Sequence, residues 1–280
     1  MDDSSRQHLL QARYGAQAIP SNLIWNPQIE HMIRHRSVRT FLQRPLPDGA
    51  LDTMVAAAQS ASTGSALHHW SLIAITDPAR KQELAALIAA TVPVARIPWI
   101  EEASALLLWV ADASRSAAIT RSRGDTPVGL AYLDALLMAT IDTSLAAQNA
   151  ALAAESLGLG VVFLGVMRNA AAEVARIVGL PDHSFIPFGM AVGHPDPARA
   201  PQMRPRPAQP MVLHHNHYDD STWQQYLDDY EAAYRAFRET SRMQPRTWQD
   251  AVHTAATSMA YMGGREHLRE FVQSRGFELK

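Results

Sequence analysis

The sequence predicts an α+β fold, because helical segments outnumber strands and the two are mixed along the chain without an internal repeat. The first observation is a stretch at 128–160 that has no proline, and no glycine between Leu130 and Leu157, so nothing inside it breaks a helix. The second is the apolar run ASALLLWVAD at 103–112, which is typical of a fully buried strand. The third is the set of further strand-like runs between helical segments, at 70–76, 161–167 and 185–192.

The helix within 128–160 is apolar around nearly its whole circumference, which indicates burial on all sides. It is not a membrane helix, because polar residues interrupt every apolar span of about 20 residues: Asp134, Asp142, Gln148, Asn149 and Glu155. About 28 helical residues would reach roughly 42 Å, more than one small domain needs. We therefore expect packing against a second copy of the helix as well as against the core of its own chain, with Ala146 and Ala150 in the contact with the second copy. Gly158 is expected to end the helix in a left-handed conformation.

Residue pairs that start helices mark the first half of the chain. Asn26 followed by Pro27 predicts a helix start, with the asparagine as N-cap. Asp77 followed by Pro78 predicts another, and Asp48 is expected to cap the helix at 50–61. Residues 113–127 hold several charges and are expected to form a mobile connection.

Three segments divide the chain. Residues 1–25 are expected to be an N-terminal extension with a short helix or a loose arm, residues 26–218 the core, and residues 219–280 a helical C-terminal segment. The proline-rich stretch at 198–210 is not expected to be regular structure. Helices are expected beyond it at 222–242, 247–262 and 265–275.

Composition excludes several classes of function. A net charge of −2 argues against a general nucleic-acid-binding protein. The absence of cysteine excludes disulfides and thiolate metal sites. The acidic, polar N-terminus is unlike a signal peptide, so a cytoplasmic location is expected. His214, His215 and His217 suggest zinc, but adjacent histidines on an extended chain point to opposite faces, which favours a polar connection.

Two arginine clusters favour a phosphorylated ligand. His35, Arg36, Ser37 and Arg39 lie within five residues at a helix end, and Arg204 and Arg206 follow in the proline-stiffened stretch. Arginine forks match phosphate oxygens, and the polar loop at 62–65 adds hydroxyl donors. Any single arginine is better explained as a solvated surface charge. The glycines at 158 and 160 are no dinucleotide fingerprint, because they follow a helix and precede a strand.

The runs HRSVRTF, AAQSASTGSALHHWS, FLGVMRN, PFGMAVGHP and RPRP, with 146–160, resemble flavin-dependent nitroreductases. The resemblance covers roughly residues 31–275 and is to the oxygen-insensitive, NADPH-preferring nitroreductase and flavin reductase branch. It implies a central mixed or antiparallel sheet flanked by helices, and an intertwined homodimer with FMN at the subunit interface. It further implies a ping-pong hydride cycle with NADPH as donor. Flavin N5 would carry the chemistry, so no catalytic side chain is expected.

The resemblance also assigns roles to the residues. His35 and Ser37, with Arg36, match positions at the FMN phosphate, on which Arg204 and Arg206 close. Arg39 matches the position at the pyrimidine end, where a cation stabilises the charge of reduced flavin. The remaining cofactor positions are a loop from the partner subunit (Ser62, Thr63 and Ser65) and the backbone that passes N5 (Leu164 and Gly165).

Arg235, Arg238 and Arg242 lie where this family holds the 2′-phosphate of NADPH, although a solvated basic face explains them equally well. Two departures concern the substrate: Val166 replaces a second glycine, and residues 91–102 form an insertion. The expected function is reduction of nitroaromatics, quinones or related small acceptors, without nucleic-acid or membrane partners. The alternatives are an NADPH-flavin reductase that supplies free reduced flavin, and a flavin-binding regulatory protein with weak turnover.

Overall fold

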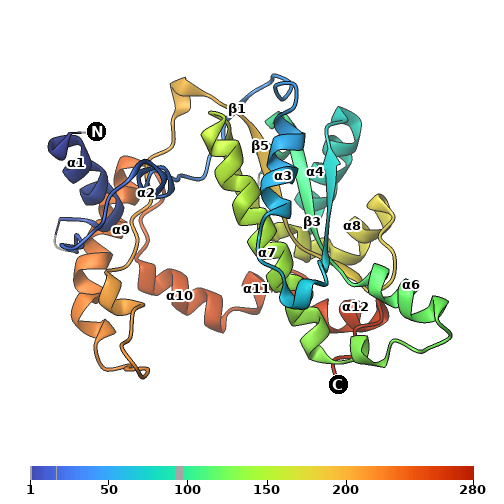
Figure 1. Ribbon diagram of the computed structural model, residues 1–280. Helices are drawn as coiled ribbons and strands as arrows, with labels where there is room; N and C mark the ends of the chain where they lie inside the picture. The colour runs from blue at the N-terminus through green and yellow to red at the C-terminus, as the bar shows by residue number, and fades with distance from the viewer. Residues whose placement is uncertain (1, 17, 93–96) are drawn as a thin grey trace. The chain divides into compact units, whose positions relative to one another are not determined.

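A computed structural model of the protein describes residues 2–16, 18–92 and 97–280, which form two compact units (Figure 1). Unit 1 comprises Met1–Arg36 and Pro201–Tyr261, and unit 2 comprises Ser37–Ala200 and Met262–Lys280. Part of the predicted insertion, at 93–96, lies outside the described residues. The three-segment division of the chain stays a prediction. No helix in the described ranges is both long and apolar enough to span a membrane.

Unit 2 is built on an antiparallel sheet in the order β1-β5-β3-β2, with β4 also paired to β5. The long β5 is the centre of the sheet: Ala105–Val192 and Val161–Val192 are aligned pairs on its two sides. The strand bounds are β1 Phe41–Leu42, β2 Trp70–Ile75, β3 Ala105–Asp112, β4 Gly160–Leu164 and β5 Ser184–Pro195. The predicted strands at 70–76, 103–112 and 185–192 are therefore confirmed.

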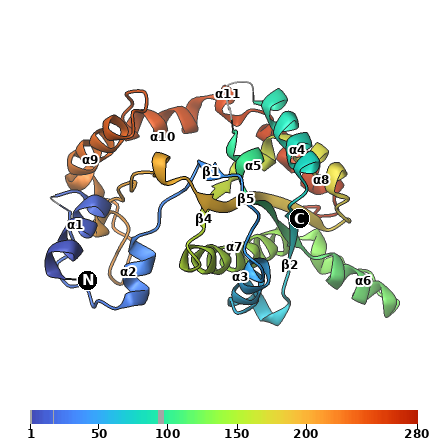
Figure 2. The same ribbon diagram turned by 90° about the horizontal axis from the view of Figure 1, so that it is seen from above.

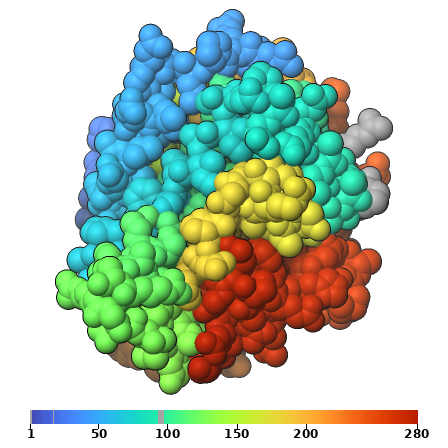
Figure 3. Space-filling view, turned by 90° about the vertical axis from the view of Figure 1, so that its right-hand side faces the viewer, coloured from blue at the N-terminus to red at the C-terminus, as the bar shows by residue number. Residues whose placement is uncertain are grey.

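Helices cover both faces of this sheet, as Figure 2 shows for α3 and α7 on one side and α4 and α8 on the other. The alternation of side chains along the fully buried β3 supplies both cores. Leu106 and Leu108 pack with Leu84 of α4, while Leu107 and Trp109 pack against α3 and α7. The helix bounds in unit 2 are α3 Ala50–Gln59, α4 Pro78–Thr91, α5 Trp99–Glu102, α6 Ser114–Ser122, α7 Leu133–Ser156, α8 Ala171–Val178 and α12 Leu268–Ser274. On the surface of Figure 3, α8 lies between α4 and the C-terminal segment.

Unit 1 contains α1 (Asp3–Tyr14), α2 (Pro27–Ile33), α9 (Leu227–Thr240) and α10 (Trp248–Thr257); the short α11 is Met259–Met262. Glu231 on α9, 4% exposed, accepts hydrogen bonds from the first amides of α10, Trp248 N at 2.9 Å and Gln249 N at 2.7 Å. A carboxylate at a helix N-terminus satisfies donors that have no partner within the helix. Short 3₁₀ helices in the two units lie at Gly64–Ala66, Val128–Ala131, Gly165–Ala170, Pro197–Arg199, Gln209–Met211, Trp223–Tyr226 and Arg265–His267.

Several local expectations are confirmed and three are wrong. The side chains of Asn26 and Asp77 cap α2 and α4, and Gly158 is left-handed, with φ 76°. Asp48 does not cap α3, because Gly49 occupies the N-cap and no side-chain hydrogen bond is made there. The expected mobile connection at 113–127 contains the helix α6. The strand expected to reach residue 167 ends at Leu164, where a 3₁₀ turn begins.

The central helix α7 is buried within its own unit on only one side. Its small residues Ala146, Ala147, Ala150, Ala151 and Ala154 are at most 1% exposed and pack against the sheet and α3. The expectation that Ala146 and Ala150 contact a second copy is therefore wrong. Large aliphatic side chains at every fourth position are instead exposed: Leu133 46%, Leu137 50%, Ile141 57% and Leu145 43%. We call these four residues the α7 stripe.

Candidate functional site

The segment 37–39 runs along the edge of β4. Val38 N donates to Val161 O at 2.9 Å, and Ser37 forms a parallel bridge with Val161. Val38 is 3% exposed, and its side chain lies over Gly160, where an added Cβ would meet Val38 Cγ2 at 2.5 Å. Because side chains alternate along an extended segment, the inward Val38 turns Ser37 and Arg39 the other way. Arg39 is exposed and Ser37 is half-buried.

The end of β4 lies further along the same strand. Leu164 is 4% exposed, and Gly165 opens the following 3₁₀ turn. A Cβ on Gly165 would lie 3.2 Å from Arg168 Nη2, at the end of a flexible side chain. Val166 packs against the core beneath α4 and α8. Unit 2 thus brings the predicted residues of segment 37–39 and of 164–165 to one strand.

The loop at 62–69 is tied to α7 by one carboxylate. Asp142, 1% exposed, accepts three hydrogen bonds: from Thr63 Oγ1 at 2.6 Å, Gly64 N at 2.8 Å and His69 N at 3.1 Å. The loop also holds three non-glycine residues in the left-handed region, namely Ser65 (φ 51°), Ala66 (φ 56°) and His68 (φ 51°). Such conformations persist only where surrounding contacts hold them, and they concentrate at binding sites.

Asp142 was missed by sequence reasoning as a site residue, although a signal existed. A carboxylate inside an otherwise apolar helix costs free energy unless donors meet it. With Thr63 committed to Asp142, the loop presents the exposed Ser62 and Ser65 to solvent. The neighbouring His69 is 3% exposed, and its Nε2 lies 2.8 Å from Ser116 Oγ. Burial lowers the pKa of His69, while the negative charge of Asp142 acts in the opposite direction.

In unit 1, Arg13 of α1 ties together both predicted phosphate-binding segments. Its guanidinium donates to Ile33 O (Nε at 3.1 Å and Nη2 at 2.7 Å), to His35 O, and to Arg204 O at 2.9 Å. Arg206 N donates in turn to Arg13 O at 2.7 Å. Sequence reasoning placed Arg13 in an extension and gave it no role, because its partners are main-chain carbonyls far along the chain.

The side chains of these segments remain accessible. Arg36 and Arg206 are exposed, while His35 and Arg204 are half-buried. The Arg204 guanidinium lies 5.3 Å from the ring centre of Phe237 on α9. Arg13 thus joins the segment of His35 and Arg36 to the segment of Arg204 and Arg206. We call its hydrogen bonds with Ile33, His35, Arg204 and Arg206 the clamp.

A groove of about 730 Å³ in unit 1 is lined by all three arginines predicted for NADPH, together with Arg246. Arg238 supports the groove wall, because its Nε and Nη2 donate to Gln244 O at 2.8 and 2.6 Å. Arg235 and Arg242 are exposed along it. Glu239 and Asp250 also line the groove, and the Asp250 carboxylate accepts from Thr247 N in a capping box. The groove is therefore basic without being uniformly so.

Comparison with known proteins covers most of the chain. The model of the "Nitroreductase family" matches residues 32–194, and that of the "Nitroreductase family, C-terminal domain" matches residues 204–280. An "NADPH-flavin oxidoreductase" of Vibrio harveyi is 33% identical over 257 residues, covering 90% of this chain and 98% of the relative. An "FMN reductase (NADPH)" of Bacillus subtilis (strain 168) is 32% identical over 263 residues, with the same coverage of 90% and 98%.

Solved structures agree with the sequence relatives. The NfrA1 nitroreductase from B. subtilis superposes with a TM-score of 0.81 at 30% identity, covering 90% of this chain and 99% of that one. The NADPH:FMN oxidoreductase from Vibrio harveyi, complexed with NAD+, gives a TM-score of 0.78 at 30% identity, covering 91% of this chain and 100% of that one.

Proposed function

This chain belongs to the nitroreductase family, and we propose that it is an FMN-dependent NADPH oxidoreductase that reduces small organic acceptors. The observation that carries the proposal is the pairing of segment 37–39 with β4. This pairing places a hydroxyl, a guanidinium and the backbone around Gly165 along one strand. The names of the relatives favour free flavin as one acceptor class, beside nitroaromatics and quinones.

The residues fit FMN by the chemistry of their donors. His35, Arg36, Arg204 and Arg206 would bind the phosphate, together with the hydroxyl of Ser37. Arg39 would face the pyrimidine end, Leu164 and Gly165 would lie along the ring, and Ser62, Thr63 and Ser65 would come from a second copy. Bound FMN would supply the hydride-transfer chemistry between NADPH and the acceptor. The part of Arg39 is to stabilise negative charge at the ring, which is worth most where water is excluded.

Anaerobic addition of NADPH to the purified, FMN-loaded protein tests this function. We expect the flavin absorbance to bleach and to return when an acceptor is added. Comparison of nitroaromatics, quinones and free FMN then identifies the class that restores it fastest. Flavin that binds but is not bleached would identify a regulatory flavin-binding protein instead, and failure to take up FMN would contradict the proposal altogether. We also propose that the protein is located in the cytoplasm.

We propose a homodimer in which the α7 stripe packs against a second copy. Replacing Ile141 with arginine should convert the dimer to monomer, because it places a charge in an apolar contact. The matched control is Ile119→Arg on α6, since Ile119 is also 57% exposed. Sedimentation at micromolar concentration measures the effect. A wild-type monomer that is fully loaded with FMN would contradict the dimer.

The basic groove is proposed as the site of the NADPH 2′-phosphate. The double replacement of Arg235 and Arg242 by alanine should raise KM for NADPH about tenfold, given the strength of charge-assisted hydrogen bonds. KM for NADH, which lacks that phosphate, should change little. Arg269→Ala removes another exposed arginine and serves as the control. Equal losses with NADH and NADPH would remove the groove from coenzyme recognition.

A further inference from the structure

Helix α1 lies outside the region that the family models match, which begins at residue 32. Within unit 1, α1 nevertheless carries Arg13, whose side chain donates several hydrogen bonds. Arg13 is 5% exposed, and its guanidinium reaches the carbonyls of Ile33, His35 and Arg204. Its own carbonyl accepts from Arg206 N at 2.7 Å. Side chain and main chain of one residue thus join two segments that are about 170 positions apart in sequence.

We propose that Arg13 is a positioning residue for the FMN phosphate, which sets the spacing between segment 33–36 and segment 204–206. This inference rests on the proposed function, because those segments carry His35, Arg36, Arg204 and Arg206. The N-terminal segment is then a part of the cofactor site rather than a loose arm.

The geometry explains why this role requires arginine. A planar guanidinium presents its donors in a fixed fork, so several carbonyls bound to it are held at set distances from one another. Burial strengthens these hydrogen bonds by lowering the local dielectric constant. Segments fixed before FMN arrives lose less conformational entropy on binding, which raises affinity without a contact to the ligand.

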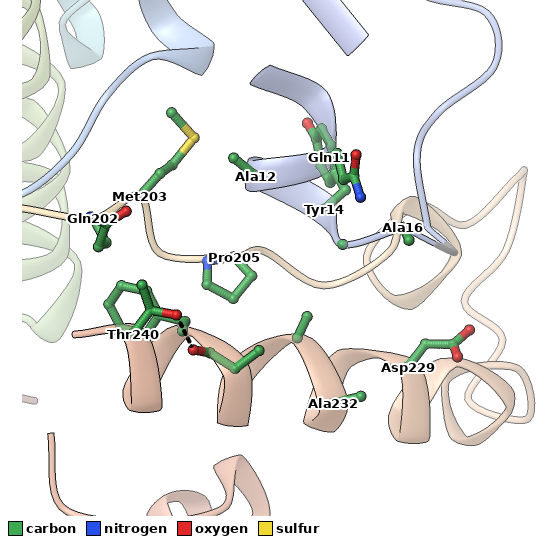
Figure 4. Close-up of a pocket in the computed structure, with 14 residues that line it drawn as sticks. Gln11, Ala12, Tyr14, Ala16, Gln202, Met203, Pro205, Asp229, Ala232 and Thr240 are labelled. Carbon is green, nitrogen blue, oxygen red and sulfur yellow. Dashed lines mark hydrogen bonds between the residues drawn. The ribbon is translucent and has the colours of Figure 1, made fainter. Parts of the chain in front are cut away.

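The surroundings of α1 hold the clamp in place. Gly15 ends the helix with φ 77°, and an added Cβ there would lie 3.2 Å from Ala233 Cβ of α9. Figure 4 shows Gln11 and Tyr14 of α1 on one side and α9 on the other of a cavity of about 420 Å³, with Pro205 between them. Segment 202–205 therefore lies between α1 and α9, next to Arg204, whose carbonyl Arg13 binds.

The test compares FMN with riboflavin, which has the same ring and no phosphate. Apoprotein is titrated with each ligand, and flavin fluorescence gives the two dissociation constants. Arg13→Ala should lower the preference for FMN over riboflavin about tenfold, the equivalent of one charge-assisted hydrogen bond. Arg13→Lys, a single cation without the fork, should give an intermediate loss. A general loss of packing would weaken both ligands alike and leave the preference unchanged.

Arg6→Ala is the matched control, since Arg6 also lies on α1 and donates to a main-chain carbonyl, Leu23 O at 3.0 Å, outside the phosphate segments. It should leave the preference at the wild-type value. An unchanged preference in Arg13→Ala, in a protein whose wild type binds FMN, overturns the inference alone. A wild type that binds no FMN overturns the proposed function as well.

If the Arg13 variants do not fold, hydrogen exchange on the wild type tests whether FMN binding is coupled to the Arg13 hydrogen bonds. Because coupling between sites is reciprocal, FMN must stabilise the clamp if the clamp favours FMN. Saturating FMN should therefore slow exchange at the amides of Gly15 and Arg206, whose acceptors are Gln11 O and Arg13 O. Riboflavin should slow them less. Equal exchange in the presence and absence of FMN contradicts the inference.

Discussion

Replacing Asp142 with alanine should lower the free energy of unfolding of the apoprotein by about 1.5–3 kcal/mol, the range for losing a hydrogen bond to a charged group. The carboxylate is 1% exposed and accepts from Thr63 Oγ1, Gly64 N and His69 N. Its removal leaves the buried amide of His69 without this acceptor, and it opens a void beside α7. The left-handed residues of the loop would then relax toward commoner conformations, so FMN affinity should fall as well.

Urea unfolding of apoprotein, followed by circular dichroism, measures the loss of stability. Asp142→Asn keeps one acceptor oxygen but turns an NH₂ group toward a donor, so its loss should be smaller and still clear. Asp134→Ala is the control: this aspartate is exposed in the first turn of the same helix, and its loss should cost about 0.3–1 kcal/mol. A similar small change for Asp142→Ala would show that the loop is held by other contacts.

Local signals were enough to predict most of the elements. The caps at Asn26 and Asp77 and the left-handed Gly158 follow from the residues themselves, because each signal acts within a few positions. The apolar run of β3 indicates burial on both faces of a sheet, and the structure places both cores there. The α+β class rests on such elements and is confirmed.

Long-range contacts account for the predictions that were wrong. The charged stretch after β3 was expected to be mobile, yet Arg115 of α6 forms an ion pair with Asp112 at 3.0 Å and donates to His68 O and Trp70 O. Its charge is used in a tertiary contact that no local pattern reveals. Arg13 was missed for the same reason, since its acceptors are carbonyls of distant segments.

Composition alone also failed to separate the two sides of α7. Alanine and leucine are both apolar, so the helix was expected to be buried all round. In the structure the alanines of α7 are buried in the core of the chain, and the α7 stripe is exposed. Small residues permit close approach to the sheet, whereas large aliphatic residues favour a broad apolar contact. The residues proposed for the dimer therefore changed, and the helix has 24 residues, Leu133–Ser156, rather than about 28.

Replacing Arg39 with alanine should slow flavin reduction by NADPH about tenfold to a hundredfold, even when FMN is saturating. Arg39 is proposed to face the ring, where negative charge appears only on reduction, so its contribution is larger in the reduced state. Removing a cation that favours the reduced form must lower the reduction potential. A tenfold preference corresponds to about 30 mV for a two-electron couple.

Arg206→Ala is the informative comparison, because the phosphate does not change its charge during turnover. Its loss should weaken FMN binding by about 1.5–3 kcal/mol, and excess FMN should restore most of the rate. Anaerobic stopped-flow on both FMN-saturated variants, with a potential measured for each, separates the two roles. An Arg39→Ala variant that is reduced at the wild-type rate, beside an Arg206→Ala variant that stays slow, would show that the two roles are reversed. Equal slowing with unchanged potentials would mean instead that neither arginine acts on the charge of the ring.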